Sequence, residues 1–209
     1  SQTPFTLGIF AMLKKFIKFL SITILLLIAI YFIFLQKRYP LNAITHSFSI
    51  GDSVDSFNGV VVYNNGMDYP KSYGKHYSKD SVYYYGKKWQ CVEFIKRYYF
   101  DYYHHQMPNG FGNAKDFFDN TIKDGELNKA RGLIQYRNEN SSCPKAGDIL
   151  IFGGKYGHVA IVTKVTDSEV EVIQQNIYMS PRETFKLIVN NGKYTIGENR
   201  KPEGWLRMK

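Results

Sequence analysis

The stretch GKKWQCVEFIKR, residues 86–97, decides which fold the sequence predicts. A glycine opens the stretch, and the spacing of Val92, Ile95 and Tyr99 then predicts a helix with one buried face. Cys91 falls in the first turn of that helix, where free backbone N–H groups and the positive end of the helix dipole favour a thiolate. Because the thiolate is the form of cysteine that attacks carbonyl carbon well, Cys91 is a candidate nucleophile.

Two alternatives to a reactive Cys91 stay open at this point. Most lone cysteines are small buried hydrophobic residues. The second cysteine, Cys143, could also pair with Cys91, although a position at a helix start favours a free thiol for Cys91. On the same helix, Glu93 and Arg97 have the i,i+4 spacing of an ion pair and are expected on the solvated side.

The composition is that of a packed globular protein with a basic surface. A length of 209 residues suits one domain with an appendage, and an aromatic content of 16% argues against disorder. The net charge of +9 would attract anionic lipid, cell-wall polymer or nucleic acid. Without a basic stripe, a recognition helix or an RNA-binding motif, no nucleic-acid partner is predicted. The cysteines lack zinc spacing, and His104 and His105 point apart on a helix, so neither a metal nor another cofactor is predicted.

An apolar segment near the N-terminus predicts one membrane-spanning helix. Residues 19–35 are apolar apart from Ser21 and Thr23, and extension back to Phe16 gives the roughly 20 residues that a bilayer core requires. The segment has no polar face and no small-x-small cleavage site, so a retained signal anchor over residues 16–36 is favoured over a removed signal peptide. The lipid bilayer is thus one expected partner.

Basic residues on either side of this segment predict its orientation. Three lysines precede it, at positions 14, 15 and 18, and two basic residues follow it, at 37 and 38. This difference favours an N-terminus in the cytoplasm and a body on the extracytoplasmic (periplasmic) side. The expected organisation is an N-terminal tail over 1–15, the anchor over 16–36, a juxtamembrane connector over 37–55 and the globular domain over 56–209.

The globular domain is expected to place helices first and an antiparallel sheet second. A strand over 59–63 leads through a long loop to the helix that begins near Cys91 and ends near His105, and a short helix follows over 113–119. Strands over 148–152, 158–165 and 169–176 then form a meander, and 185–189 with 194–196 form a hairpin. This order predicts an α+β domain.

The register of the meander places a histidine beside an amide. A turn centred on Asp167 pairs Val165 with Glu169 and sets His158 opposite Asn176, with Gln174 as its diagonal neighbour. A shift of the register by one residue would place Gln175 beside His158 instead. Cysteine, histidine and amide then form a triad, in which the histidine takes the thiol proton and the amide orients the ring. The alternative is a structural histidine that follows a glycine turn.

Several short motifs in a fixed order resemble the CHAP family of cysteine, histidine-dependent amidohydrolases/peptidases. Within this family, the sequence resembles the amidase domain of glutathionylspermidine synthetase/amidase and that of trypanothione synthetase. The likeness runs from about Gly59 to the C-terminus. The motifs are WQCVEF (89–94), GNA (112–114), GDI (147–149), GHVAIV (157–162), QN (175–176), NIYMSP (176–181) and GW (204–205).

The resemblance implies a papain-like fold of the CHAP/NlpC-P60 type, with Cys91 as nucleophile and His158 as general base. Members of the family cleave amide bonds in peptidoglycan peptides or between glutathione and spermidine. Where the family usually has glutamate, this chain has Gln174, which can orient an imidazolium but cannot stabilise it by charge. Asn176 could share that role.

Four further residues are predicted to contribute to the site. The backbone N–H of Cys91 at the helix start is the natural oxyanion donor, and Gln90 could add its side chain or its N–H, although a role as a simple turn residue explains Gln90 equally well. Trp89 is expected to line the cleft, although packing in the core would explain it as well. The amidase domain tends to have two arginines where this chain has Lys96 and Arg97, which are therefore expected to contact the substrate, although a lysine lacks the planar fork that suits a carboxylate.

Three functions follow from these residues. The leading prediction is a membrane-anchored cysteine amidase or endopeptidase that acts on peptidoglycan peptides through a thioester intermediate. The second is an amidase for glutathionylspermidine or a similar small amide. The third, motivated by Gln174, is an inactive domain that binds such a molecule without cleaving it.

Overall fold

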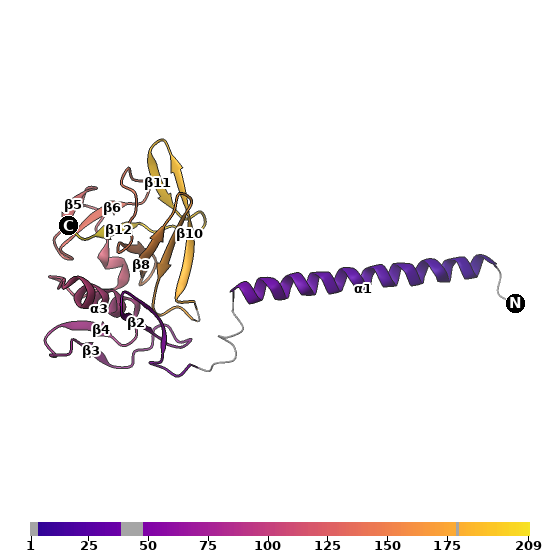
Figure 1. Ribbon diagram of the computed structural model, residues 1–209, viewed down its shortest axis with the longest axis horizontal. Coiled ribbons are helices and arrows are strands. Elements are labelled where there is room, and N and C mark those ends of the chain that lie inside the picture. The colour runs from indigo at the N-terminus through magenta and orange to yellow at the C-terminus, as the bar shows by residue number, and fades with distance from the viewer. Residues whose placement is uncertain (1–3, 39–47, 179) are drawn as a thin grey trace. The chain divides into compact units, whose positions relative to one another are not determined.

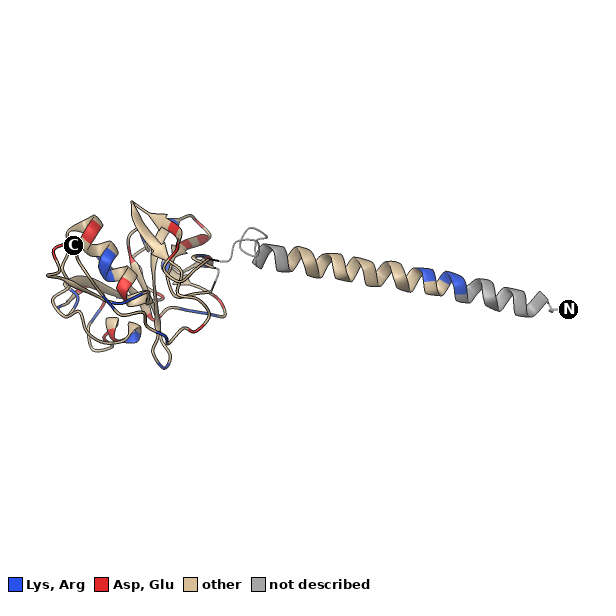
Figure 2. Ribbon diagram, turned by 90° about the horizontal axis from the view of Figure 1, so that it is seen from below, with Lys and Arg blue, Asp and Glu red and all other residues tan. Residues whose placement is uncertain are grey.

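The computed structural model describes residues 4–38, 48–178 and 180–209 of the chain (Figure 1). The chain divides into two compact units, residues 1–47 and 48–209. The first contains the helix α1 (Pro4–Arg38), of which Lys14–Phe34 is long and apolar enough to cross a membrane. Between Phe19 and Phe34 this helix carries no charged residue, and Lys14, Lys15 and Lys18 lie on the N-terminal side of that stretch (Figure 2).

The second unit combines a helix and a 3-10 turn with an eight-stranded antiparallel sheet and two short hairpins. The sheet has the strand order β11-β10-β9-β8-β7-β12-β6-β5, and the hairpins are β1-β2 and β3-β4. The elements are β1 (Ser53–Phe57), β2 (Val60–Tyr63), β3 (Lys75–Tyr77), β4 (Tyr84–Lys87), α3 (Cys91–Tyr103), η1 (Ala114–Phe117), β5 (Glu126–Asn128), β6 (Leu133–Arg137), β7 (Ile149–Phe152), β8 (His158–Val165), β9 (Glu169–Ile173), β10 (Arg182–Asn190), β11 (Lys193–Ile196) and β12 (Gly204–Arg207).

The sheet separates two apolar cores, because side chains alternate between the faces of a strand. On β7, Ile149 and Ile151 point to the core that the helix α3 covers, whereas Leu150 and Phe152 point to the core on the opposite face. The apolar spacing of α3 buries its aromatic and aliphatic side chains against β8 and β2. The helix therefore fixes the position of its first residue, Cys91, against the N-terminal end of β8.

The predicted mixture of helix and antiparallel sheet is confirmed, but several boundaries differ. The body begins before Asp55, because Ser53–Phe57 pair with β2, and the expected loop before Gly86 contains the hairpin β3-β4. Residues 39–47 of the predicted connector lie outside the described residues. The helix α3 ends at Tyr103, because His104 takes a left-handed conformation with φ of 54°.

The pairing of β8 with β9 confirms the predicted register where it matters for the site. Ile161 pairs with Ile173 as expected. Nearer the turn an irregularity shifts the register, so that Val165 pairs with Val170, and the predicted pairing with Glu169 is wrong. One bulged residue absorbs the difference between the real turn and the expected one.

Candidate active site

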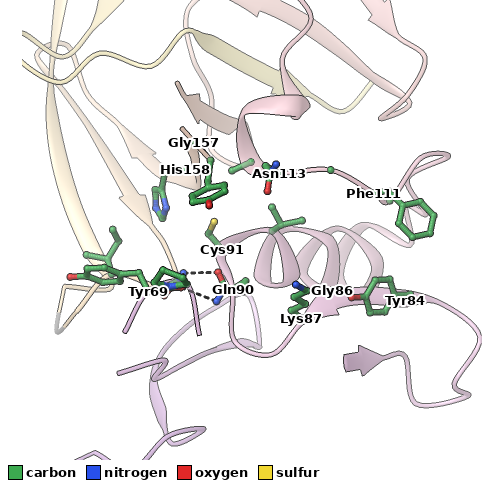
Figure 3. Close-up of a pocket in the computed structure, with 18 of the residues that line it drawn as sticks. Tyr69, Tyr84, Gly86, Lys87, Gln90, Cys91, Phe111, Asn113, Gly157 and His158 are labelled. Atoms are coloured by element: carbon green, nitrogen blue, oxygen red, sulfur yellow. Dashed lines mark hydrogen bonds between the residues drawn. The ribbon is translucent and has the colours of Figure 1, made fainter. Parts of the chain in front are cut away.

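Cys91 and His158 line one cavity of about 780 Å³ on the body. Cys91 is the first residue of α3, and His158 is the first residue of β8. Figure 3 shows the sulfur and the imidazole pointing into the same space. Residues from distant loops complete the wall, among them Tyr69, Phe111 and Tyr156. The structure thus brings together the two residues that the sequence predicted as nucleophile and base.

The position of Cys91 at a helix start does not make it a thiolate. Its side chain is 7% exposed, and burial raises the pKa of the thiol to about 11. The backbone N–H groups of Val159, Val92 and Cys91 itself lower the pKa, as expected at a helix start, but they do not offset the desolvation. The nearby carboxylate of Glu93 raises the pKa further. The expectation of a stabilised thiolate is therefore wrong for this structure.

His158 is oriented by Gln174, as the register predicted. Its Nε2 lies 3.0 Å from the side-chain oxygen of Gln174, an amide that is 1% exposed. The amide nitrogen of Gln174 donates to the carbonyl of Ser180 at 3.3 Å and to Glu183 at 3.1 Å, so its oxygen must face the histidine. His158 therefore carries its proton on Nε2 and leaves Nδ1 unprotonated.

The imidazole is neutral at physiological pH. Burial lowers the pKa of His158 to about 4, and the positive charge of Arg200 acts in the same direction. The hydrogen bond that His158 donates to Gln174 opposes both effects but is smaller. With a neutral thiol beside a neutral imidazole, the resting pair is not an ion pair, and the proton has to move when a substrate is attacked.

The backbone N–H of Cys91 is a suitable oxyanion donor, since the first helical residue has no helical acceptor. Gln90 is less able to donate to the oxyanion than the sequence predicted. Its side-chain nitrogen donates to the carbonyls of Tyr69 at 3.0 Å and Lys71 at 2.7 Å, and its N–H donates to Lys87 at 3.0 Å. Gln90 lines the cavity, but its side-chain donors are bound to the loop at residues 69–71, part of which also lines the cavity (Figure 3).

Asn176 supports the same loop and does not orient His158. Its side-chain nitrogen donates to Tyr69 at 3.0 Å and to the side-chain oxygen of Gln90 at 2.8 Å. Its oxygen accepts from Asn65 at 2.5 Å. Among the described contacts, the amide partner of His158 is Gln174, so the predicted sharing of that role is not supported.

Glu93 and Arg97 belong to a buried cluster with Gln175 and His76, which we call the scaffold cluster. Glu93 is 0% exposed and accepts from Arg97 at 2.6 Å, from Gln175 at 2.6 Å and from His76 at 2.8 Å. Burial would raise the pKa of Glu93, but these hydrogen bonds and the guanidinium hold it below its usual value. The predicted exposed ion pair is therefore wrong, because the helix buries this face against β2 and the end of β9.

The three residues predicted to contact substrate do not line the described cavity. Arg97 is held in the scaffold cluster, and Trp89 packs on Tyr63 with ring centroids 4.0 Å apart. Lys96 is 1% exposed and donates to the carbonyls of Tyr84 and Gly110, and burial lowers its pKa to about 8. The helix α3 turns Lys96 and Arg97 away from the opening, and Trp89, which precedes the helix, packs against β2.

Two cations line the cavity, Lys87 and Arg200, and only Lys87 lies near Cys91 along the chain. Lys87, at the end of β4, and Arg200, between β11 and β12, both contribute to the wall. Arg200 stacks on Phe152, 4.3 Å from the ring centroid, and donates to Glu183 at 2.6 Å. The contacts of Arg200 depend on the fold, since Arg200 lies far from Cys91 and His158 along the chain.

The other predicted alternatives can also be compared with the structure. Cys91 and Cys143 are both free thiols, so the disulfide alternative is wrong. Among the described residues, no three side chains of His, Cys, Asp or Glu are grouped so that they could hold a metal ion.

Comparison with known proteins confirms the resemblance read from the motifs. Residues 82–176 match the family model described as the CHAP domain. The bifunctional glutathionylspermidine synthetase/amidase of Escherichia coli (strain K12) is 30% identical over 158 residues, which cover 66% of this chain and 25% of that protein. The glutathionylspermidine synthase of Crithidia fasciculata is 34% identical over 98 residues, or 44% of this chain and 14% of that protein. The chain thus spans a quarter or less of the length of these relatives.

Proposed function

With residues 82–176 forming a CHAP domain, we propose that this chain is a cysteine-dependent amidohydrolase or peptidase with a papain-like body. Cys91 is the nucleophile, His158 the general base and Gln174 the residue that orients the base. The observation that carries the proposal is the shared cavity of Cys91 and His158, in which Gln174 holds the ring by its Nε2.

The proposed reaction moves one proton and breaks one C–N bond. The thiol proton of Cys91 passes to Nδ1 of His158 as the sulfur attacks the carbonyl carbon of the amide. The backbone N–H of Cys91 donates to the oxyanion of the tetrahedral intermediate. Nδ1 returns the proton to the leaving nitrogen, and a thioester on Cys91 remains. His158 then activates a water molecule, which releases the carboxylic acid and restores the thiol.

The charge of the cavity supports a substrate that carries carboxylates. None of the described lining residues is Asp or Glu, whereas Lys87 is a cation and Arg200 is a cation whose charge is partly offset by Glu183. Two more cations lie under the wall: Lys96 donates to Gly110 at 3.2 Å, and Arg131 donates to Phe111 at 3.2 Å. A positive site attracts anionic substrates and repels cationic ones. We therefore propose peptidoglycan peptides, which carry free carboxylates, as the substrate.

The second candidate is an amidase for glutathionylspermidine or a similar small peptide-polyamine amide. It is supported by the names of the relatives, two of which are bifunctional glutathionylspermidine synthetase/amidases. The polyamine half of such a substrate is cationic, and the described cavity wall has no carboxylate to receive it. The cavity charge therefore favours the first candidate.

We further propose that α1 anchors the protein in the bilayer, with the body on the extracytoplasmic side where peptidoglycan lies. The support is the apolar run that ends at Phe34 and the excess of lysines before it. Reporter fusions at the C-terminus test the orientation. A reporter that is active only in the cytoplasm would remove the peptidoglycan proposal.

Substrate digestion separates the candidates. The full chain, purified in detergent, is incubated with muropeptides and with glutathionylspermidine, and the products are identified by mass spectrometry. We expect the muropeptides to be cleaved at least about 10-fold faster, the size of one unfavourable charge contact. Faster cleavage of glutathionylspermidine would select the second candidate. If wild type cleaves neither substrate, the inactive binding domain is the remaining function.

A further inference from the structure

The amide that orients His158 is itself held by a carboxylate from the neighbouring strand. Gln174 follows β9, and Glu183 lies on β10, where it pairs with Val172. The Gln174 nitrogen donates to the Glu183 carboxylate at 3.1 Å, and Arg200 donates to the same carboxylate oxygen at 2.6 Å. A continuous chain of hydrogen bonds thus runs from the imidazole through an amide to an ion pair.

The Glu183 carboxylate fixes which way the amide of Gln174 points. In the observed orientation, the nitrogen faces two acceptors, the Ser180 carbonyl and Glu183, and the oxygen faces Nε2 of His158. The flipped amide would place its oxygen against the carboxylate and its nitrogen against the ring. A charged acceptor makes the observed orientation the stronger one, and it also polarises the amide so that its oxygen becomes a better acceptor.

We propose that Glu183 is a positioning residue for the reaction. Acting through Gln174, it keeps the proton of His158 on Nε2, leaves Nδ1 unprotonated toward Cys91, and supplies negative charge that stabilises the imidazolium once it forms. It takes over, one hydrogen bond further out, the role of the carboxylate that family members usually carry at position 174. This inference rests on the proposed function, because only in that function does His158 receive the thiol proton of Cys91.

The charged groups around His158 agree with this role. Arg200 is the cation that acts on the ring, and its pairing with Glu183 offsets a positive charge that would oppose the imidazolium. Cys91 faces the ring from α3, and Phe152 packs beside it from β7, with ring centroids 6.3 Å apart. Glu183 is therefore the carboxylate that reaches His158 through one intervening side chain.

Stability alone does not explain the arrangement. The side chains of Arg200 and Glu183 are 42% and 33% exposed, and ion pairs this exposed contribute little to folding. Replacing Glu183 should therefore leave the fold intact, so that an effect on catalysis can be measured separately.

The experiment compares Glu183→Gln, Gln174→Glu and the double variant in the full chain, with Glu198→Gln as the matched control. Glu198 pairs with Lys186 at 2.7 Å as an exposed carboxylate beside β10, and none of its described contacts reaches Gln174. We expect Glu183→Gln to lower kcat about 10-fold with little change in KM, because a neutral acceptor replaces a charged one. The control should keep wild-type kcat.

The charge-relocation variants give the sharper result. Gln174→Glu alone sets two carboxylates against each other, so one of them holds a proton and kcat falls. The double variant carries one carboxylate on the ring and an amide behind it, and it should regain at least about 10-fold in kcat over Gln174→Glu. Equal activity of Gln174→Glu and the double variant would overturn the proposal, as would an unchanged kcat in Glu183→Gln.

A readout without substrate separates this proposal from the proposed function. Nitrogen NMR of the His158 ring should show the Nε2–H tautomer in wild type and Glu198→Gln, and a mixture of tautomers in Glu183→Gln. A single Nε2–H tautomer in Glu183→Gln would overturn the positioning role, whether or not any amide is cleaved. If wild type cleaves no amide but the tautomer shifts, the proposed function fails and the link from Glu183 to His158 stands.

Discussion

Two polar clusters at the start of α3 show how the same burial can serve stability or chemistry. We call Cys91, His158 and Gln174 the reaction cluster, beside the scaffold cluster defined above. The two share neighbouring positions along the chain: Cys91 and Glu93 are two residues apart on the helix, and Gln174 is followed at once by Gln175. Each pair is divided between the clusters because the helix and the strand turn successive side chains in different directions.

The clusters differ in whether a buried ionisable group has an opposite charge beside it. In the scaffold cluster, a fully buried carboxylate is matched by a guanidinium and two further partners, so it stays ionised. In the reaction cluster, burial without an opposite charge raises the pKa of Cys91 and lowers that of His158, so both stay neutral. Paired burial fixes a charge in place, whereas unpaired burial leaves a proton to be exchanged when a substrate arrives.

The largest expected effect is the loss of turnover in Cys91→Ala. Removal of a nucleophile typically lowers kcat by about 10⁴-fold or more. Because Cys91 contributes little to the scaffold cluster, the thermal midpoint should change little. Cys143→Ser is the control and should keep wild-type turnover. Equal kcat in Cys91→Ala and wild type, measured with muropeptides, would assign the chemistry to another residue.

The next effect falls on stability and belongs to the scaffold cluster. Glu93→Ala leaves the buried Arg97 without its carboxylate and should lower the free energy of unfolding by about 3–5 kcal/mol. Glu198→Ala removes an exposed carboxylate and should cost about 1 kcal/mol or less. Urea titration of both variants measures the difference, and equal midpoints would mean that the buried pair is not structural.

The adjacent glutamines should differ in their effect on activity. Gln174→Ala releases the His158 ring and should lower kcat about 10- to 100-fold, and it should also cost about 1–3 kcal/mol of stability because the buried Nε2–H loses its acceptor. Gln175→Ala leaves the Tyr63 N–H and a Glu93 oxygen without a partner and should cost about 1–3 kcal/mol of stability. If Gln175→Ala lost activity without losing stability, the division between the two clusters would be wrong.

The last effect concerns the pH dependence of the resting thiol, which is measured without turnover. Because the pKa of Cys91 is raised to about 11, the thiolate is the minor form at neutral pH and increases as pH rises. In a Cys143→Ser background, alkylation by iodoacetamide should rise roughly tenfold per pH unit between about pH 6 and about pH 9. A plateau across neutral pH would instead indicate a resting thiolate–imidazolium pair.

Local patterns in the sequence were enough to predict the helix at Cys91, the meander and the contact from His158 to Gln174. The helix and strand periods fix which residues share a face, and the β8-β9 register is preserved near His158 although the turn was misplaced by one residue.

The burial of the site residues and their long-range partners depend on contacts between distant segments, which no local sequence pattern contains. The spacing of Glu93 and Arg97 shows that they can pair. They pair inside the protein because Gln175 and β2 pack against this face of the helix. Desolvation of Cys91 and the link from Gln174 to Glu183 likewise follow from packing between distant segments.

The central claim is that Cys91 forms a covalent acyl intermediate with the proton passed to His158. The direct measurement is an acid quench of the full chain during turnover of a muropeptide, followed by peptide mapping by mass spectrometry. We expect the peptide containing Cys91 to gain the mass of the acyl part of the substrate as a thioester. Turnover that proceeds with the acyl group on another residue, or with Cys91 replaced, would contradict it.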